Sequence, residues 1–204
     1  FDFAAFRGPD LEADLADRDF TINAIAMDMD DLQKVYDPLG GIADLHAKTL
    51  RACSLTAFEN DPVRILRAIR LAAEFDLRIT PETRSRMRTE TSGLGNVSIE
   101  RIRDEMFNIL KGQRVATSLR ALDMLGVIEF IFPDLIALKG LAQATPHVMD
   151  AWDHTLDTIR QLEKLLQILG KPHDQYISGS LLMGLATMRV GRFRGQIQEM
   201  LSTS

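Results

Sequence analysis

The sequence has a single cysteine, Cys53, among its 204 residues. An internal disulfide and a zinc site built from several cysteines are therefore excluded, and one thiol is typical of a protein from a reducing compartment. The sequence also has no apolar run that approaches the ~20 residues of a membrane helix, and no leader of the secretory kind. We therefore expect a cytoplasmic protein that has no membrane partner.

The sequence also has no internal repeat and no low-complexity stretch. Its overall composition is typical of a globular protein. Apolar residues make up 46% and charged residues 26% of the chain, which is enough to bury a core. The first residues, FDFAAFRG, read as an alternating strand without an initiating methionine. We expect from this that the chain begins inside a domain.

The formal net charge of −5 is unevenly distributed along the chain. Residues 1–63 carry 5 basic and 13 acidic side chains, residues 64–120 carry 12 and 7, and residues 121–204 carry 7 and 9. The three parts therefore have net charges of −8, +5 and −2. A basic middle between acidic ends indicates a local track for a polyanion.

The expected secondary structure changes from mixed to helical at about residue 55, so the predicted fold class is α+β. A strand is predicted for residues 1–7, a short helix for 19–29 and turns with short strands for 34–53. Helices are then expected to begin near Asp61, Pro81 and Ser98, with Asn60 or Asp61 as the cap of the first. Further helices are expected at residues 115–125, 147–169 and 175–190.

Four short segments occur in an informative order. The first three are RDFTINA at residues 18–24, DPLGG at residues 37–41 and DPVRILRAIR at residues 61–70. They resemble motifs B, C and D of the class II tRNA nucleotidyltransferases and bacterial poly(A) polymerases. The segment SIERI at residues 98–102, followed by Glu105, is similar to motif E of that family. The resemblance covers roughly residues 1–135.

The resemblance implies an enzyme that adds CMP or AMP, or both, to RNA 3′ ends, such as the CCA end of tRNA or poly(A). Its substrates would be ATP and CTP, its partner a tRNA or other RNA 3′ end, and its cofactor Mg²⁺. It also implies a division into the end of a nucleotidyltransferase head in residues 1–55, a helical neck in 56–113 and a helical body in 114–204. The neck would carry the helix that selects the nucleotide.

The resemblance places the metal-binding carboxylates before Phe1, so we expect this chain alone not to extend RNA. Asp2 is a candidate accessory carboxylate beside them, and an outward-facing acid on the opening strand is an equally good interpretation. No metal ligand is assigned within the chain.

Asp61 and Arg64 have a spacing that suits recognition of a base. On a helix, residues at i and i+3 share a face, so a carboxylate acceptor and a guanidinium donor can point at one ligand. Cytosine and adenine each present an amine beside an unprotonated ring nitrogen, and this pair matches them better than guanine or uracil. The resemblance implies this base-reading role, with Arg67 and Arg70 as supporting or phosphate-facing groups. The alternative is a helix cap followed by a solvated arginine face.

The segment at residues 18–24 carries further candidates for nucleotide binding. Arg18 could contact a triphosphate, and the resemblance implies that Asp19 and Asn23 hold the ribose. A local cap and ion pair is the alternative. Gly40 and Gly41 are expected to form a tight turn that needs positive φ, and the resemblance implies a hinge there.

Two positions depart from the family pattern. Asp17 stands where the family usually has a second arginine, and Asn60 stands where it usually has a glutamate. The first change removes a positive charge near the expected triphosphate. The second removes an acid that could brace Arg64.

The basic middle part supplies candidates for RNA binding. Its arginines are predicted to guide RNA phosphates, and an ordinary solvated face is the alternative. The candidates are Arg84, Arg86, Arg88, Arg101 and Arg103.

A second class of function is suggested by the C-terminal part. His147, Asp150 and His154 share a helical face and could ligate a metal, and the surrounding segment is similar to the start of an HD phosphohydrolase domain. The His173-Asp174 doublet lacks the helical context that such a domain needs. Caps and solvated side chains are the alternative for these residues, and Trp152 is expected in the core. A helical RNA-binding module without catalysis and a fragment of an HD hydrolase therefore remain the two rival functions.

Overall fold

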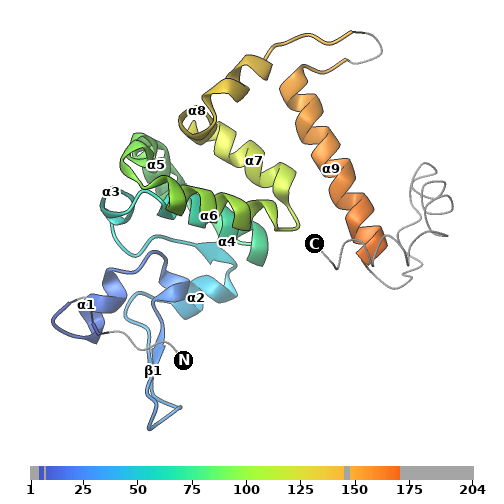
Figure 1. The fold of residues 1–204 in the computed structure, drawn as a ribbon. Coiled ribbons are helices and arrows are strands. Elements are labelled where there is room, and N and C mark those ends of the chain that lie inside the picture. Colours follow the sequence, from blue (N-terminus) through green and yellow to red (C-terminus); the bar gives the residue numbers. More distant parts are fainter. Residues whose placement is uncertain (1–4, 7, 145–147, 171–204) are drawn as a thin grey trace.

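The computed structural model describes residues 5–6, 8–144 and 148–170 (Figure 1). Its N-terminal part contains short elements only. These are α1 (Leu11–Ala16), a 3₁₀ turn (Thr21–Asn23), β1 (Ala26–Met27), β2 (Val35–Tyr36), α2 (Gly41–His46) and β3 (Thr49–Leu50). The rest is helical except for one two-residue strand. The elements are α3 (Ala57–Asn60), α4 (Arg64–Phe75), β4 (Arg78–Ile79), α5 (Pro81–Thr89), a 3₁₀ segment (Thr91–Asn96), α6 (Ile99–Leu110), α7 (Val115–Met124), α8 (Val127–Ile131), a 3₁₀ segment (Pro133–Leu138) and α9 (Ala151–Gly170).

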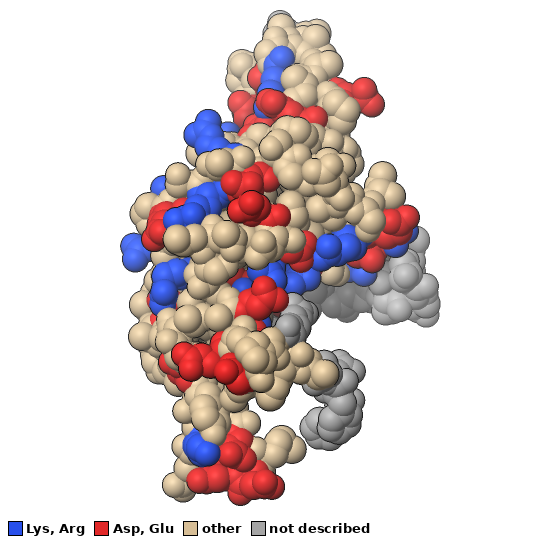
Figure 2. Space-filling view, turned by 90° about the vertical axis from the view of Figure 1, so that its left-hand side faces the viewer, with Lys and Arg blue, Asp and Glu red and all other residues tan. Residues whose placement is uncertain are grey.

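Two small sheets organise the N-terminal part. β1 and β2 form an antiparallel hairpin that projects away from the helices, and β3 pairs in parallel with β4 (Figure 1). The second sheet joins the two parts of the chain, because Leu50 lies opposite Ile79. Acidic side chains gather at the lower end of the face shown in Figure 2, whereas lysines and arginines gather over its middle.

Helix α4 lies at the centre of the core. Its apolar face buries Ile65, Leu66 and Ile69, as the 3.6-residue period predicts. These side chains belong to one cluster with Phe20 of the N-terminal part. The cluster extends through α7 to Trp152 of α9, which is 6% exposed and donates from its ring nitrogen to Asp123 at 3.2 Å. The prediction that Trp152 belongs to the core is confirmed.

Most helices after residue 60 are where the sequence predicts them, and the α+β fold class is confirmed. The cap proposed for the first of them is wrong: α4 begins at Arg64, and neither Asn60 nor Asp61 caps it with its side chain. Thr80 does cap α5 through the backbone N–H of Thr83. The expected strand at residues 1–7 and the helix at 175–190 lie largely or wholly outside the described residues.

The helix expected at residues 19–29 is also wrong. A three-residue 3₁₀ turn and β1 replace it, and the neighbouring helix α1 was not foreseen. The side chain of Asp19 accepts from the backbone N–H of Phe20 and from the amide of Asn23, so local side-chain bonds compete with a helix there. In the described part of the chain, no helix has the length and apolar character needed to cross a membrane.

Candidate functional site

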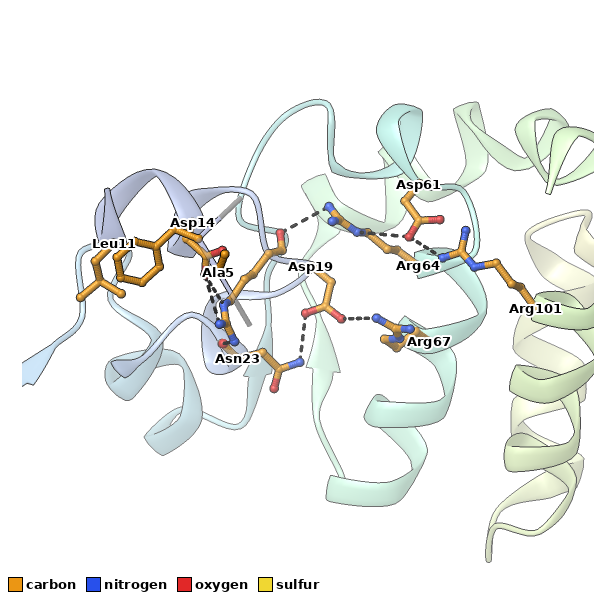
Figure 3. Close-up of a pocket in the computed structure, with 11 residues that line it drawn as sticks. Ala5, Leu11, Asp14, Asp19, Asn23, Asp61, Arg64, Arg67 and Arg101 are labelled. Atoms are coloured by element: carbon orange, nitrogen blue, oxygen red, sulfur yellow. Dashed lines mark hydrogen bonds and ion pairs between the residues drawn. The ribbon is translucent and has the colours of Figure 1, made fainter. Parts of the chain in front are cut away.

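The first cavity, of about 600 Å³, lies where α1 and the turn after it face the start of α4 and helix α6 (Figure 3). It is lined by Ala5, Phe6, Leu11, Asp14, Arg18, Asp19, Asn23, Asp61, Arg64, Arg67 and Arg101. The structure thus brings together six of the seven residues predicted to bind nucleotide. The seventh, Arg70, does not line the cavity, and its contact with nucleotide stays a prediction.

Asp61 lies between two arginines at one wall of the first cavity (Figure 3). Arg101 of α6 donates to its Oδ2 at 2.8 Å, and Nε of Arg64 lies 3.9 Å from the same oxygen. Asp61 precedes α4 rather than belonging to it, but the carboxylate and the guanidinium still meet as the i, i+3 spacing predicts. The predicted RNA ligand Arg101 therefore has a different partner in this structure, a carboxylate of the cavity wall.

Two buried polar atoms of this wall have no hydrogen-bond partner among the described residues: Oδ1 of Asp61 and Nε of Arg64. One is an acceptor and the other a donor, and they belong to adjacent side chains. Unpaired buried polar atoms are costly in a folded protein and are uncommon. The wall therefore contains an unpaired acceptor and an unpaired donor on neighbouring side chains, both of them buried in this structure.

The rest of the Arg64 guanidinium is occupied by the backbone. Nη2 donates to the carbonyl of Asp17 at 2.8 Å, and Nη1 donates to the carbonyls of Arg18 and Ala57 at 3.4 and 3.3 Å. The residue is only 6% exposed. Arg64 therefore anchors the segment after α1 to α4, in addition to lining the cavity, and a solvated arginine face is wrong at this position.

Asp19 is a second acidic centre of the cavity and is 8% exposed. Its Oδ1 accepts from the backbone N–H of Phe20 at 2.8 Å and from the amide of Asn23 at 3.0 Å. Its Oδ2 accepts from Nη1 of Arg67 at 3.1 Å. The carboxylate thus fixes the orientation of Asn23 toward the cavity (Figure 3).

Arg18 is held at the cavity by Asp14, one helical turn earlier. Its Nε and Nη2 donate to Oδ2 of Asp14 at 3.3 and 3.1 Å, and its side chain stays 47% exposed. A cation that is partly exposed can still contact an anionic ligand. The sequence interpretation did not include Asp14, although its i, i+4 spacing from Arg18 is a signal that could have found it.

Glu105 of α6 is a further residue that the predicted nucleotide site did not include. It is buried, and its two oxygens accept from Nε of Arg67 at 3.1 Å and from Nε of Arg70 at 2.9 Å. Arg70 also pairs with the exposed Glu74. Burial disfavours the charged form of Arg67, but the hydrogen bonds that it donates to Asp19 and Glu105 raise its pKa above the usual value. Arg67 therefore carries a permanent charge into the cavity.

The glycine turn predicted for residues 40–41 is confirmed. Gly40 has φ of 73°, and the Asp37 carboxylate accepts from the backbone N–H groups of Gly41 and Ile42, at the start of α2. A Cβ at Gly41 would lie 2.0 Å from the carbonyl oxygen of Thr21, so α2 packs directly against the turn that carries Asn23. The hinge role stays a prediction.

The predicted RNA-binding arginines do not form one group. Arg86 donates to Glu82 and to the carbonyl of Leu55, and Arg103 pairs with Asp104 next to it. Arg84 and Arg88 line a second cavity on another side of α4. RNA binding by these arginines stays a prediction.

No group of three or more histidine, cysteine or acidic side chains that could hold a metal is found within residues 5–6, 8–144 and 148–170. Asp2, His147 and the His173-Asp174 doublet lie outside the described residues. The Asp150 carboxylate accepts from the backbone N–H of Asp153 at the start of α9 and from that of Gly140. Both hydrogen bonds lower the pKa of Asp150, and the bond from Asp153 has the larger effect. They support the cap interpretation of Asp150.

Two family descriptions match this chain. Residues 3–51 match the poly(A) polymerase head domain, and residues 76–139 match a segment described as the probable RNA and SrmB-binding site of polymerase A. The first match includes Arg18, Asp19 and Asn23. The second begins after α4 and includes α5, α6 and α7.

Curated relatives agree with these matches. The CC-adding tRNA nucleotidyltransferase of Geobacter sulfurreducens is 44% identical over 133 residues, which are 64% of this chain and 30% of the relative. The multifunctional CCA protein of an Azoarcus species is 40% identical over 166 residues, or 78% and 40% of the two chains. The A-adding tRNA nucleotidyltransferase of Deinococcus radiodurans is 34% identical over 159 residues, or 76% and 36%. The chain thus spans 30 to 40% of the length of these relatives.

Solved structures show the same fold. The CCA-adding enzyme of Thermotoga maritima in complex with tRNA is 29% identical with a TM-score of 0.58, over 78% of this chain and 35% of that one. The CCA-adding enzyme of Bacillus stearothermophilus in complex with CTP is 33% identical with a TM-score of 0.54, over 58% and 30% of the two chains.

Proposed function

We propose that this chain, which belongs to the tRNA nucleotidyltransferase and poly(A) polymerase family, selects and holds the incoming nucleotide in an enzyme that adds CMP or AMP to RNA 3′ ends without a nucleic-acid template. The substrates are CTP, ATP and a tRNA or another RNA that ends in a free 3′ hydroxyl. The division into head, neck and body at residues 55 and 113 is part of the same proposal, as is a cytoplasmic location.

The observation that carries this proposal is the unpaired acceptor and donor of the cavity wall. Both atoms are buried in this structure, on residues that line the cavity. A shift of the two side chains toward the cavity would let Oδ1 of Asp61 accept from the exocyclic amine of cytosine or adenine, while Nε of Arg64 donates to the adjacent ring nitrogen. Guanine and uracil present a carbonyl and a protonated ring nitrogen instead. The carboxylate of Asp61 would then face another acceptor, and the guanidinium of Arg64 would face another donor. Protein side chains would thus replace a template in choosing C and A.

The rest of the cavity suits the other parts of a nucleotide. Asn23 and Asp19 offer an amide and a carboxylate to ribose hydroxyls, and the exposed part of Arg18 offers a cation to the phosphates. Arg67 adds a second permanent charge on the same cavity. Four of the lining side chains are arginines and three are aspartates, so the cavity can bind an anion without being uniformly basic.

The reaction needs Mg²⁺, which activates the attacking 3′ hydroxyl and stabilises the departing pyrophosphate. The side chains within the described ranges do not provide a metal cluster. We propose that the ligands come from outside those residues.

Nucleotide binding by the chain tests base selection directly. Calorimetric titration with CTP, ATP, GTP and UTP should give tighter binding of CTP or ATP. Asp61→Asn should lower that preference by about ten- to a hundred-fold, because it removes one charge-assisted hydrogen bond. Asp61 is the better position to change, since Arg64 also holds backbone carbonyls. Arg103→Gln, on the outside of α6, is the control, and equal binding of all four nucleotides by the parent would contradict the proposal.

The transfer reaction is tested in a chimera, in which this chain replaces the aligned segment of the Geobacter sulfurreducens enzyme. The chimera should add labelled CMP or AMP to a tRNA without its 3′ end in the presence of Mg²⁺, and Asp61→Asn should relax the choice of nucleotide. A folded chimera that binds CTP or ATP but adds neither would favour the non-catalytic RNA-binding module instead.

A further inference from the structure

A second cavity, of about 740 Å³, lies between α4, β4, α5 and α7. Ile69, Ala72 and Ala73 of α4 line it, whereas Arg64 and Arg67 of the same helix line the first cavity. At 3.6 residues per turn these two sets of positions lie on roughly opposite sides of the helix. The second cavity is therefore separate from the nucleotide-selecting one, and its volume falls in the range of small-ligand pockets.

The rim of this second cavity is strongly basic. Four arginines and one acid, Asp76, line it, which gives a net charge of +3. Asp76 pairs with Arg114 and lies 3.7 Å from Nζ of Lys48, so its charge is already compensated. The other three arginines, Arg78, Arg84 and Arg88, have exposed side chains that make no hydrogen bond or ion pair with the described residues.

The placement of these three cations is fixed by the backbone. Arg84 and Arg88 are one turn apart on α5, so both face the same way. Arg78 lies on β4, whose pairing with β3 holds it next to the start of α5. By contrast, Arg86 on the same helix is paired with Glu82. One arginine of α5 is therefore ion-paired, whereas the other two line the same cavity as Arg78.

The floor of the cavity is apolar. Its lining includes Ile69, Leu77, Met87 and Leu125, all of which are buried core residues. Basic rims around an apolar floor suit a ligand that combines negative groups with a flat organic part, as a nucleotide of an RNA strand does. A regular RNA duplex keeps its bases paired and stacked inside, so it could offer phosphates to the rim but no base face to the floor.

We propose that this second cavity binds a single-stranded segment of RNA, with phosphates on Arg78, Arg84 and Arg88 and one nucleotide over the apolar floor. The proposal rests on the proposed function, since it places part of the RNA substrate. The cavity lies largely within residues 76–139, the segment that matches an RNA-binding description, which favours RNA over an acidic protein. The RNA would thus be held on one side of α4 while the incoming base is read on the other.

Binding of a fluorescent oligoadenylate to the full chain, followed by anisotropy at several salt concentrations, tests the proposal. Changing Arg78, Arg84 and Arg88 together to glutamine should weaken binding by roughly ten- to a hundred-fold. It should also reduce the slope of log K against log salt by about 2, since each phosphate contact on a single strand contributes about 0.7. The matched control changes Lys34, Arg120 and Arg160 to glutamine, which removes the same charge from ion-paired positions outside the predicted RNA-binding residues. Equal losses in both triple variants would overturn the proposal.

A second variant separates the floor from the rim. Thr117 lines the cavity from α7 and is exposed, so Thr117→Trp should fill space without removing a charge or disturbing the core. It should weaken binding of the oligoadenylate severalfold and leave the salt slope unchanged. An RNA duplex of the same length should bind more weakly than the oligoadenylate and be insensitive to Thr117→Trp. An unchanged affinity for oligoadenylate in this variant would overturn the placement of a nucleotide over the floor.

Two further results keep the alternatives apart. Tight binding of poly-glutamate that is lost in the Arg78, Arg84 and Arg88 variant, with no effect of that variant on RNA, would overturn the proposal in favour of an acidic protein partner. The Arg78, Arg84 and Arg88 variant should keep the preference of the parent for CTP or ATP, because these residues do not line the first cavity. Failure of base selection at the first cavity and failure of RNA binding at the second are therefore separate outcomes.

Discussion

Arg67 donates a hydrogen bond to the carboxylate of Asp19, at 3.1 Å and 48 positions earlier in the sequence. The same guanidinium donates to Glu105, 38 positions later. One side chain of α4 therefore connects the turn that carries Asn23 with helix α6. Because α6 also carries Arg101, the partner of Asp61, the geometry of the whole first cavity depends on this connection.

Glu105 should be the most important acid for stability in this network. Glu105→Ala leaves Arg67 and Arg70 without their shared partner, and breaking a buried pair costs about 3–5 kcal/mol. The cost here should be nearer 2 kcal/mol, because the Arg67 side chain is 34% exposed and water screens its charge. Urea denaturation measures this as a lower free energy of unfolding.

Glu74→Ala is the matched control for Glu105. Glu74 also pairs with Arg70, at 3.2 Å, but its side chain is 52% exposed. Its removal should cost about 0.5 kcal/mol or less, as for other surface ion pairs. Similar free energies of unfolding for the two variants would show that the connection through α6 is not important for stability.

Arg64→Ala should destabilise the fold as well as impair nucleotide selection. It removes three hydrogen bonds from a guanidinium that is 6% exposed and leaves the carbonyls of Asp17 and Ala57 without this donor. We expect a loss of about 3 kcal/mol or more in the free energy of unfolding, with partial recovery in Arg64→Lys. A stable Arg64→Ala protein in urea denaturation would argue that these bonds contribute little.

The first cavity was largely predictable from sequence because its residues come from short local segments. Helical spacing predicts that Asp61 and Arg64 meet, and the segment at residues 18–24 supplied Arg18, Asp19 and Asn23 as candidates for the same nucleotide through the resemblance to a family, which is now confirmed. The helix expected at residues 19–29 was wrong because side-chain bonds of Asp19 override a weak periodic pattern. Local rules therefore identified the side chains better than the backbone that carries them.

Contacts between distant elements could not be predicted in the same way. Arg101 was assigned to RNA, but it lies against Asp61, 40 positions away. Arg84, Arg86 and Arg88 were predicted as one group, although the i, i+4 spacing of Glu82 and Arg86 could have identified the ion pair of Arg86. That Arg84 and Arg88 line one cavity with Arg78 of β4 depends on the tertiary structure, which the periodicity of the helix does not predict.

Gly41→Ala should be strongly destabilising. Its Cβ would lie 2.0 Å from the carbonyl oxygen of Thr21, which is backbone and cannot rotate away, so α2 would have to separate from the turn before β1. We expect a loss of about 3 kcal/mol, as for severe overpacking. Gly95→Ala is the control, because a Cβ there meets no atom within 4 Å. Thermal unfolding should show a lower midpoint for Gly41→Ala only, and equal midpoints would contradict the close packing.

Cys53 should be an unreactive thiol in the folded protein. Burial, together with the nearby Asp19 carboxylate, raises the pKa of the Cys53 thiol to about 12, because both disfavour the thiolate. Only the thiolate reacts with iodoacetamide, and its fraction falls tenfold for each pKa unit above the ambient pH. At about pH 8, where a free thiol is partly ionised, alkylation should be slower than in urea by on the order of a thousand-fold. The rate in the folded protein should rise as the pH approaches this pKa.

Mass spectrometry of the alkylated chain gives both rates, and the unfolded chain serves as the internal reference for the same thiol. Equal rates in the folded and unfolded chain would show that neither burial nor Asp19 protects Cys53.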